Sequence, residues 1–274
     1  MKDNKVFSAV ILTAVAAIWG SAFLSMKGTL ERLDVNSFLA WRFTIATLFL
    51  IAFRPTFYRK ITKDLFIKAF AAGLVLGAGY ILQTEGLART GAAITGFITG
   101  LYVVATPLIS ALFLRKKISL FTWGCVALAT VGLALLSLRG WSMGFGEFLV
   151  LLCAVAFGAH IVALGQWSAG RDVYAMTTVQ LFAVTVLTGG FAFAEGYQAP
   201  PDSDVWAVVI FTAIICTSFG FIVQTWAQAH IDSTKVAVIL TLEIVFAALF
   251  AITLGSESMS IQVALGGIIL LTAM

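Results

Sequence analysis

Long apolar runs alternate with short polar segments along the whole chain, and this pattern predicts an all-α membrane protein. A helix that crosses the hydrocarbon core of a bilayer needs about 20 mostly apolar residues. The runs predict ten transmembrane helices, over residues 6–26, 38–53, 67–83, 92–113, 121–138, 148–165, 175–194, 205–225, 234–254 and 261–274. Glycines and other small residues are scattered through the runs, as close packing between helices in lipid requires.

The composition excludes a soluble domain. Hydrophobic residues make up 61% of the chain and charged residues 11%, whereas a soluble domain carries about 25% charged residues. The mean hydropathy is +1.02. The net charge of +4 does not indicate nucleic acid, because the basic residues lie in the short segments between apolar runs. We therefore expect the lipid bilayer as the surroundings and no nucleic-acid partner.

Lysine and arginine are distributed unevenly over the polar segments. If the N-terminus is cytoplasmic, the inner side holds twelve of them: Lys2, Lys5, Arg54, Arg59, Lys60, Lys63, Lys68, Arg115, Lys116, Lys117, Arg171 and Lys235. The outer side holds three, Arg32, Arg89 and Arg139. Cytoplasmic segments of membrane proteins are enriched in these residues. The pattern therefore predicts a multi-pass protein of the inner (cytoplasmic) membrane with its N-terminus in the cytoplasm.

One short motif occurs twice. Gly79-Tyr-Ile-Leu-Gln83-Thr84 reappears 141 residues later as Gly220-Phe-Ile-Val-Gln224-Thr225. At a spacing of 138 residues, Trp19-Gly20 matches Phe157-Gly158, Arg42 matches Gln180, and Thr47 matches Thr185. We therefore expect two five-helix repeats, residues 1–140 and 141–274. Because five is an odd number, the second repeat is inverted relative to the first, as in many secondary transporters, whose site lies near the middle of the membrane.

The glutamines of the duplicated motif are the first candidate site residues. An amide without a partner is costly in hydrocarbon, so Gln83 and Gln224 are expected to line a shared cavity with the rings of Tyr80 and Phe221. A hydrogen bond that simply packs two helices together is the alternative. The predicted substrate-binding set is completed by Trp19, Thr99, Tyr102 and His160. Such a lining suits a ligand with an apolar body and a polar or zwitterionic head.

Two of these candidates have a plain structural alternative, and one further residue is charged. The hydroxyl of Thr99 could bond to its own helix, and His160 could be a neutral imidazole bonded to a neighbouring helix. Glu243 is the only carboxylate deep within an apolar run, where it must be paired, protonated or in contact with water. Glu243 and His160 are therefore candidates for coupling proton movement to substrate movement. The structural alternative for Glu243 is a fixed ion pair with Arg42.

Several stretches together resemble one transporter family. They are Ala17-Ile-Trp19-Gly20-Ser21, Trp41-Arg42-Phe43, Thr106-Pro107-Leu108 and Leu242-Glu243-Ile-Val-Phe246-Ala-Ala-Leu249. Their order and spacing are similar to those of the drug/metabolite transporter superfamily, in its ten-helix EamA-type branch. The resemblance covers essentially the whole chain. It implies alternating access and export of amino acids, related metabolites or toxic small molecules.

The sequence therefore predicts a secondary transporter of small metabolites, with no enzymatic activity, cofactor or metal. No nucleotide fingerprint, zinc-binding helix or catalytic triad appears at usable spacing, and Cys125, Cys153 and Cys216 all lie inside apolar runs. We expect the substrate to be an exported amino acid, aromatic or otherwise neutral. A proton is a second candidate partner, and the protein is expected to be a monomer or a weak dimer.

Four alternatives stay open at this point. A multidrug transporter of the same fold would need more than one intramembrane carboxylate, and a nucleotide-sugar-type transporter would use Lys27 and Arg42 as its cations. An intramembrane lipid-modifying enzyme would need clustered acids, histidines or a metal site. A receptor or scaffold would have a helix bundle without a cavity of substrate size.

Overall fold

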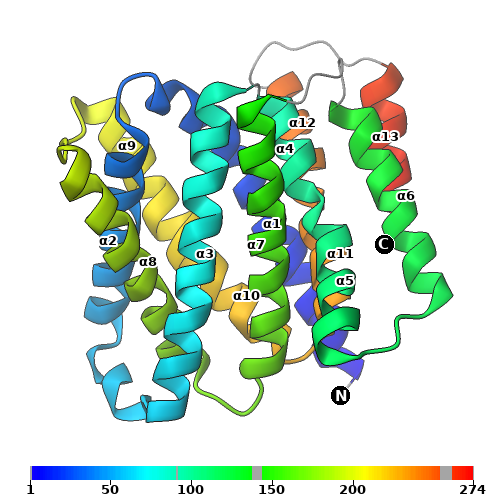
Figure 1. Ribbon diagram of the computed structural model, residues 1–274, viewed down its shortest axis with the longest axis horizontal. Helices are drawn as coiled ribbons and strands as arrows, with labels where there is room; N and C mark the ends of the chain where they lie inside the picture. The colour runs from blue at the N-terminus through cyan, green and yellow to red at the C-terminus, as the bar shows by residue number, and fades with distance from the viewer. Residues whose placement is uncertain (1, 91, 138–143, 254–260, 274) are drawn as a thin grey trace.

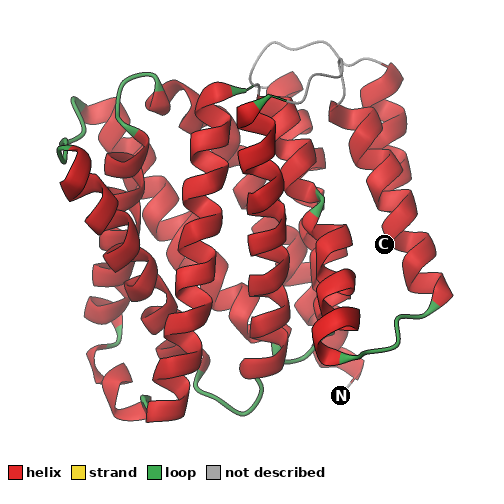
Figure 2. Ribbon diagram, viewed as in Figure 1, coloured by secondary structure: helices red, strands yellow, loops and turns green. Residues whose placement is uncertain are grey.

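The described part of the chain is helical throughout. In the computed structural model it comprises residues 2–90, 92–137, 144–253 and 261–273, and within these ranges no strand occurs (Figure 1, Figure 2). The elements are α1 (Lys2–Leu30), α2 (Val35–Phe53), η1 (Pro55–Lys60), α3 (Lys63–Arg89), α4 (Ala92–Gly100), α5 (Tyr102–Leu114), α6 (Leu120–Ser137), α7 (Phe145–Trp167), α8 (Val173–Glu195), α9 (Ser203–Phe211), η2 (Thr212–Phe219), α10 (Gly220–Gln228), α11 (Ser233–Leu240), α12 (Leu242–Thr253) and α13 (Ile261–Thr272). The all-α class predicted from the apolar runs is therefore confirmed.

Polar side chains between the apolar runs determine where several helices begin. Asp34, Asp172, Asp202 and Asp232 accept hydrogen bonds from backbone N–H groups in the first turns of α2, α8, α9 and α11, and Thr62 does the same for α3. These caps satisfy N–H groups that have no partner within the helix. The polar breaks in the hydropathy pattern thus become the starts of helices.

Six helical stretches are long and apolar enough to cross a membrane. They are Val35–Phe53, Lys63–Arg89, Thr95–Leu114, Phe145–Trp167, Val173–Glu195 and Ser203–Gln228. Shorter apolar stretches occur at Val6–Ala22 and Leu120–Gly132. Six of the ten predicted spans thus meet the length and hydropathy expected of a membrane crossing, and the count of ten stays a prediction.

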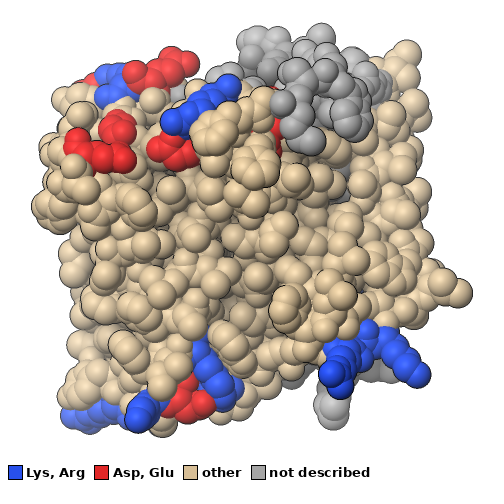
Figure 3. All heavy atoms as spheres, in the orientation of Figure 1, with Lys and Arg blue, Asp and Glu red and all other residues tan. Residues whose placement is uncertain are grey.

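An apolar band separates two charged ends of the molecule. Figure 3 shows the Lys, Arg, Asp and Glu side chains gathered at these ends, with uncharged side chains over the face between them. Large apolar side chains are strongly exposed, for example Phe113 at 80%, Leu120 at 90% and Phe193 at 76%. Many threonines, serines and glutamines are buried instead. This reversal of the pattern in soluble proteins fits a molecule surrounded by lipid.

Ion pairs hold loops together at both ends. At the end that contains the N-terminus in Figure 1, the pairs are Arg54–Asp172 at 3.5 Å, Arg171–Asp64 at 2.6 Å and Lys116–Asp232 at 3.5 Å. At the opposite end, Arg32 pairs with Asp202. Most of the predicted inner basic residues can be followed in this way, whereas Lys2, Lys5, Lys27 and Arg139 lie outside the residues whose side chains are described.

Helices of the two predicted repeats pack closely against one another. α3 lies against α7 and α8, α2 against α8, α1 against α12, and α6 against α13 (Figure 1). Glycine makes the closest approaches possible. A Cβ at Gly73 of α3 would meet the backbone of Gln180 in α8, and a Cβ at Gly20 of α1 would lie 2.8 Å from the backbone nitrogen of Ala247 in α12. Small residues within the apolar runs therefore serve helix packing.

Three of the predicted spans are interrupted, which differs from the continuous helices expected from hydropathy. Leu101 separates α4 from α5, and Thr241 separates α11 from α12. In the eighth predicted span, Thr212–Phe219 form the π-helix η2 between α9 and α10. Hydropathy reports length and burial but not hydrogen-bond register, so the sequence pattern could not reveal these interruptions.

Candidate functional site

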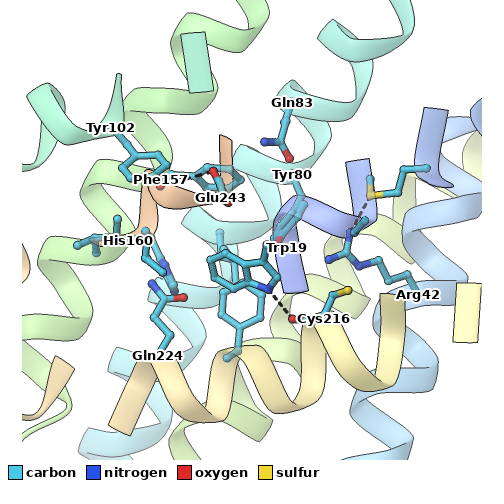
Figure 4. A pocket seen from close by; sticks show the side chains of 16 residues that line it. Trp19, Arg42, Tyr80, Gln83, Tyr102, Phe157, His160, Cys216, Gln224 and Glu243 are labelled. Atoms are coloured by element: carbon cyan, nitrogen blue, oxygen red, sulfur yellow. Dashed lines mark hydrogen bonds between the residues drawn. The ribbon is translucent and has the colours of Figure 1, made fainter. Parts of the chain in front are cut away.

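A cavity lies inside the bundle, between helices of both predicted repeats (Figure 4). The unfilled space, including its opening, is about 640 Å³, and small-molecule sites typically span about 300–1,000 Å³. The lining residues are Trp19, Ala22, Met26, Arg42, Leu76, Tyr80, Gln83, Tyr102, Phe157, His160, Ile161, Cys216, Phe221, Gln224, Leu240 and Glu243. A bundle without a substrate-sized cavity, as the scaffold alternative requires, does not describe this structure.

The cavity brings together nearly all of the candidate residues. Trp19, Arg42, Tyr80, Gln83, Tyr102, His160, Phe221, Gln224 and Glu243 line it. Thr99 does not line it but lies behind Gln83, and its hydroxyl accepts a hydrogen bond from Gln83 Nε2 at 3.2 Å. Both glutamines of the duplicated motif therefore reach the same interior space, one from α3 and one from α10.

Aromatic rings form most of the apolar wall. The ring centroids of Trp19 and Phe221 are 5.4 Å apart, and those of Tyr80 and Phe157 are 5.3 Å apart. The rings of Tyr80 and Phe221 meet edge to face at 6.2 Å, and the His160 ring packs on Phe221 at 6.0 Å. Edge-to-face contacts of this kind fix the orientation of each ring, so the wall is preformed for an apolar group.

The π-helix η2 contributes two groups to the site. At the junction of η2 and α10, the Gly220 N–H donates to the carbonyls of Ile215 and Thr217. The carbonyl of Cys216, which an α-helix would have used for that N–H, accepts a hydrogen bond from Trp19 Nε1 at 2.7 Å instead. A π-segment within an α-helix is rare and frequently occurs at functional sites.

The polar groups of the cavity are only partly satisfied. His160 Nε2 lies 2.9 Å from Gln180 Oε1, which is the helix-to-helix bond expected of a structural histidine. Gln224 Nε2 donates to Gln228 Oε1 at 3.1 Å, and Gln228 Nε2 donates to the carbonyl of Ile161 at 2.6 Å. The Oε1 atom of Gln224 is buried and has no hydrogen-bond partner. A buried acceptor without a partner is costly, so a ligand that donates to Gln224 would complete this network.

Two ionisable side chains of opposite charge lie in the cavity without pairing. Glu243 Oε1 accepts a long hydrogen bond of 3.5 Å from the hydroxyl of Tyr102. Arg42 Nε donates to Thr217 Oγ1 at 2.8 Å. The predicted fixed ion pair between Arg42 and Glu243 is not formed among the described residues. Each group has instead a neutral hydroxyl partner, because the rings of Trp19 and Tyr80 lie between them in the view of Figure 4.

Sequence reasoning missed the apolar part of the lining. Phe157 could have been found, because it matches Trp19 at the spacing of 138 residues that relates the two repeats. The others, such as Leu76 and Leu240, carry no signal in the sequence that separates them from residues facing lipid. Sequence reasoning recognised the polar and ring-bearing members because those residues are unusual in an apolar run.

The described residues offer no metal centre. Within them, no group of three or more His, Cys, Asp and Glu side chains could hold a metal ion. The cysteines at positions 125, 153 and 216 are all free. What the cavity offers chemically is reversible binding by an apolar wall, amides, one carboxylate and one guanidinium.

Comparisons with known proteins match the whole chain. A family model described as the EamA-like transporter family matches residues 7–138 and again residues 144–274. An uncharacterized transporter of Archaeoglobus fulgidus is 32% identical over 271 residues, which cover 98% of this chain and 85% of that protein. The uncharacterized transporter YoaV of Bacillus subtilis is 25% identical, over 94% of this chain and 92% of its own.

Two further similarities concern function and fold separately. A protein of Streptantibioticus cattleyicolor bears the name "Probable terminal-alkyne amino-acid exporter" and is 25% identical, over 85% of this chain and 79% of its own. A solved crystal structure is similar with a TM-score of 0.81, at 15% identity, over 97% of this chain and 94% of that one. The second similarity concerns the fold alone.

Proposed function

The chain belongs to the EamA-like transporter family, and from this premise we propose that it exports neutral amino acids by alternating access. The resemblance to the EamA-type branch of the drug/metabolite transporter superfamily is confirmed. The predictions of a membrane transporter and of no enzyme are confirmed as well, since the relatives are named as transporters. What this family membership leaves open is the substrate, its direction and the arrangement of the repeats.

We propose the ten-helix arrangement as two inverted repeats, residues 1–140 and 141–274. The two separate matches of one family model, over residues 7–138 and 144–274, support it. Matched packing supports it too. Gly20 of α1 packs on the backbone of Ala247 in α12, while Gly158 of α7 packs on the backbone of Thr106 in α5. These two contacts are exchanged by the repeat spacings, because 20 + 138 = 158 and 106 + 141 = 247.

Two hydrogen bonds join residues that are equivalent between the repeats. Thr47 Oγ1 lies 3.0 Å from Thr185 Oγ1, at a separation of 138 residues. The hydroxyl of Tyr102 donates to Glu243 at 3.5 Å, at a separation of 141 residues. A contact between equivalent positions of two related units lies on the pseudo-two-fold axis that relates them. Since Tyr102 and Glu243 line the cavity, the axis would pass through it, where inverted-repeat transporters bind their substrates.

The observation that carries the substrate class is the pairless charges in one aromatic cavity. Glu243 can accept from an ammonium group, Arg42 can donate to an anion, and the rings of Trp19, Tyr80 and Phe221 can hold an apolar side chain. A zwitterion with an apolar side chain meets all three requirements. The relative named as an amino-acid exporter supports this class. A nucleotide-sugar-type substrate fits less well, because Arg42 is the one described cation of the lining.

The proposal includes coupling to protons through Glu243, with His160 as the second candidate. Glu243 is 6% exposed and has one long hydrogen bond, so it can exchange a proton with little rearrangement. His160 is held by Gln180 at 2.9 Å, which favours a positioning role. We further propose an inner-membrane location with a cytoplasmic N-terminus and a monomer or weak dimer, supported for the orientation by the basic residues in the predicted inner segments.

Transport by purified protein in liposomes tests the proposal. Radiolabelled L-phenylalanine, L-leucine and L-alanine would be followed with and without a pH gradient, beside a cationic dye and a nucleotide sugar. We expect saturable amino-acid movement that a pH gradient accelerates. Glu243→Gln is expected to retain exchange of substrate but lose the acceleration, and His160→Ala to retain both. Transport of the dye or the nucleotide sugar in place of any amino acid would refute the proposed substrate class.

A further inference from the structure

Arg42 is a deeply placed cation. It lies in α2, eight residues after the capping residue Asp34, which is about 12 Å along the helix axis at 1.5 Å per residue. The residue is 3% exposed and lines the cavity. A guanidinium at this depth in a membrane protein is expensive unless an anion accompanies it, and such residues mark sites of function.

The protein supplies no anion to this guanidinium. Of its five N–H donors, the Nε–H bonds to the neutral hydroxyl of Thr217 at 2.8 Å, and Nη1 lies 3.7 Å from the weak acceptor Met26 Sδ. Among the described residues, no carboxylate lies within ion-pair distance of it. The guanidinium also lies over the rings of Tyr80 at 4.9 Å and Phe43 at 5.5 Å. Ring faces offset only part of the cost of a buried charge.

The same contacts hold the guanidinium in a fixed orientation. Thr217 belongs to the π-helix η2 and engages the Nε–H, while Tyr80 covers one face of the planar group. In Figure 4 the side chain approaches the cavity beside Trp19 and Tyr80, with Glu243 beyond these rings. A guanidinium whose plane is fixed and whose terminal nitrogens are not used by acceptors of the protein is preorganised for a carboxylate, which it binds through two parallel hydrogen bonds.

The other repeat shows that the helix packing at this position does not need a charge. The residue matched to Arg42 is Gln180 of α8, which is 1% exposed. Its amide is satisfied by His160 at 2.9 Å and by the carbonyl of Met176 at 3.3 Å. A neutral amide thus fills the equivalent position with good hydrogen bonds, and the charge at position 42 is an addition that packing alone does not explain.

We propose that Arg42 is the carboxylate-binding group of the cavity, which receives the carboxylate of the transported amino acid as a paired, charge-assisted hydrogen bond. This inference rests on the proposed function in one respect, that the cavity is the substrate site. It adds the direction in which the substrate lies. The carboxylate faces α2 and η2, and the side chain faces the rings of Trp19 and Phe221.

Matched ligands test the assignment on the purified full-length protein. Dissociation constants would be measured in carboxylate-free buffer for L-phenylalanine, L-leucine and L-alanine and for their α-amides, which keep the ammonium and side chain but lose the negative charge. For at least one pair we expect the acid to bind about 10- to 100-fold more tightly than the amide, the range of a hydrogen bond between charged groups.

Three variants make the test specific. Arg42→Gln, which installs the residue of the other repeat, is expected to weaken acid binding about 10- to 100-fold and to leave amide binding within about threefold. Arg42→Lys keeps the charge without the planar fork and is expected to lie between the two. The matched control is Arg54→Gln, because Arg54 closes the same helix, pairs with Asp172 and does not line the cavity. It is expected to bind like the unaltered protein.

The melting temperature without ligand separates binding from a purely structural role. If Arg42 acts as proposed, Arg42→Gln removes an uncompensated buried charge and melts at the same temperature or higher. If Arg42 served only to hold α2 against η2, the variant would melt lower and would weaken acids and amides alike. Should Arg42→Gln not fold, Arg42→Lys decides, because an undiminished preference for acids in that variant overturns the assignment.

Other results refute the assignment outright. Equal binding of acids and amides by the unaltered protein, a preserved preference in Arg42→Gln, or no binding of any acid of the panel would each overturn it. The proposed function is judged separately in liposomes. Amino-acid transport without a preference for the carboxylate would leave the transporter intact and remove the subsite. A preference in binding without any transport would do the reverse.

Discussion

The glycines that open the two copies of the duplicated motif are expected to control the shape of the cavity. Gly220 packs directly beneath the indole of Trp19, so that a Cβ there would lie 2.7 Å from Nε1, 3.3 Å from Cε2 and 3.4 Å from Cζ2. An ordinary Cβ contact is 3.4–4 Å. Gly220→Ala must therefore displace the indole by about 0.7 Å or more, and the ring borders the cavity, so the displacement narrows the site.

The size of the effect follows from these contacts. Overpacking of a well-packed interior costs about 1–3 kcal/mol, and the 2.7 Å bond from Trp19 Nε1 to the Cys216 carbonyl is lost or lengthened as the ring moves. At about 2–4 °C per kcal/mol for a chain of this size, the melting temperature should fall by roughly 2–12 °C. Amino-acid transport should fall more steeply than stability, because the displaced ring occupies space that the substrate needs.

The chain provides both a second instance and a control. A Cβ at Gly79 would lie 2.5 Å from Cε1 of Phe157, another ring of the cavity wall, so Gly79→Ala should behave like Gly220→Ala. A Cβ at Gly189 of α8 would meet no atom within 4 Å, so Gly189→Ala should be neutral or stabilise slightly. Melting curves and liposome transport rates check all three variants. If Gly220→Ala and Gly189→Ala behave alike in both assays, the packing argument is wrong.

Three further predictions concern the repeats, the closest helix contact and the orientation. Thr47→Val removes the bond to Thr185, whose hydroxyl keeps a bond to the Leu181 carbonyl; we expect a loss of about 0.5–1 kcal/mol, seen as a small fall in melting temperature, and a loss several times larger would contradict this. Gly20→Ala directs a methyl group at backbone atoms of α12 that cannot rotate away; we expect strongly reduced folded yield, measured by size-exclusion chromatography, and a normal yield would show that α1 and α12 are less closely packed. With the native cysteines replaced, a cysteine at Arg32 should react with an impermeant thiol reagent on whole cells and one at Lys117 only after lysis; the opposite result would invert the topology.

The sequence predicted the helical class and most of the polar lining for a common physical reason. In an apolar run, a glutamine, histidine or carboxylate is costly in lipid, so its presence alone indicates that it faces the interior. Gln83, His160 and Glu243 were recognised in this way, and the structure places each of them at the cavity. Leu76 and Leu240 could not be recognised, because a leucine is equally stable facing lipid or a cavity wall.

Contacts between side chains were harder to predict than their location. Arg42 and Glu243 were considered as a fixed ion pair because both are charged and lie within apolar runs. The structure gives each a neutral hydroxyl partner, Thr217 and Tyr102. Opposite charge makes a pair favourable only if the backbone brings the groups within reach, and that distance depends on the crossing of α2 with α12, which the sequence pattern does not specify.

The π-helix η2 has a cause in one difference between the repeats. Trp19 donates through Nε1 to the Cys216 carbonyl, and the Gly220 N–H turns to the carbonyls of Ile215 and Thr217. The matched residue in the second repeat is Phe157, which has no N–H to donate. It packs on Gly79 of α3, and α3 is α-helical over its whole length. A ring with a donor is thus associated with the shifted register, and a ring without one with the regular helix.

This association yields a last prediction, for Trp19→Phe. The variant removes the donor, so the Cys216 carbonyl is left without its partner in an apolar interior, at a cost of about 1–3 kcal/mol. Return of residues 212–219 to the α-helical register would restore the partner, because the Gly220 N–H could then donate to Cys216. Such a return moves Thr217 relative to Arg42, which it contacts at 2.8 Å. We therefore expect a structure of Trp19→Phe to show an α-helix here and acid binding to weaken. A retained π-helix with Cys216 unpartnered would contradict the proposed cause.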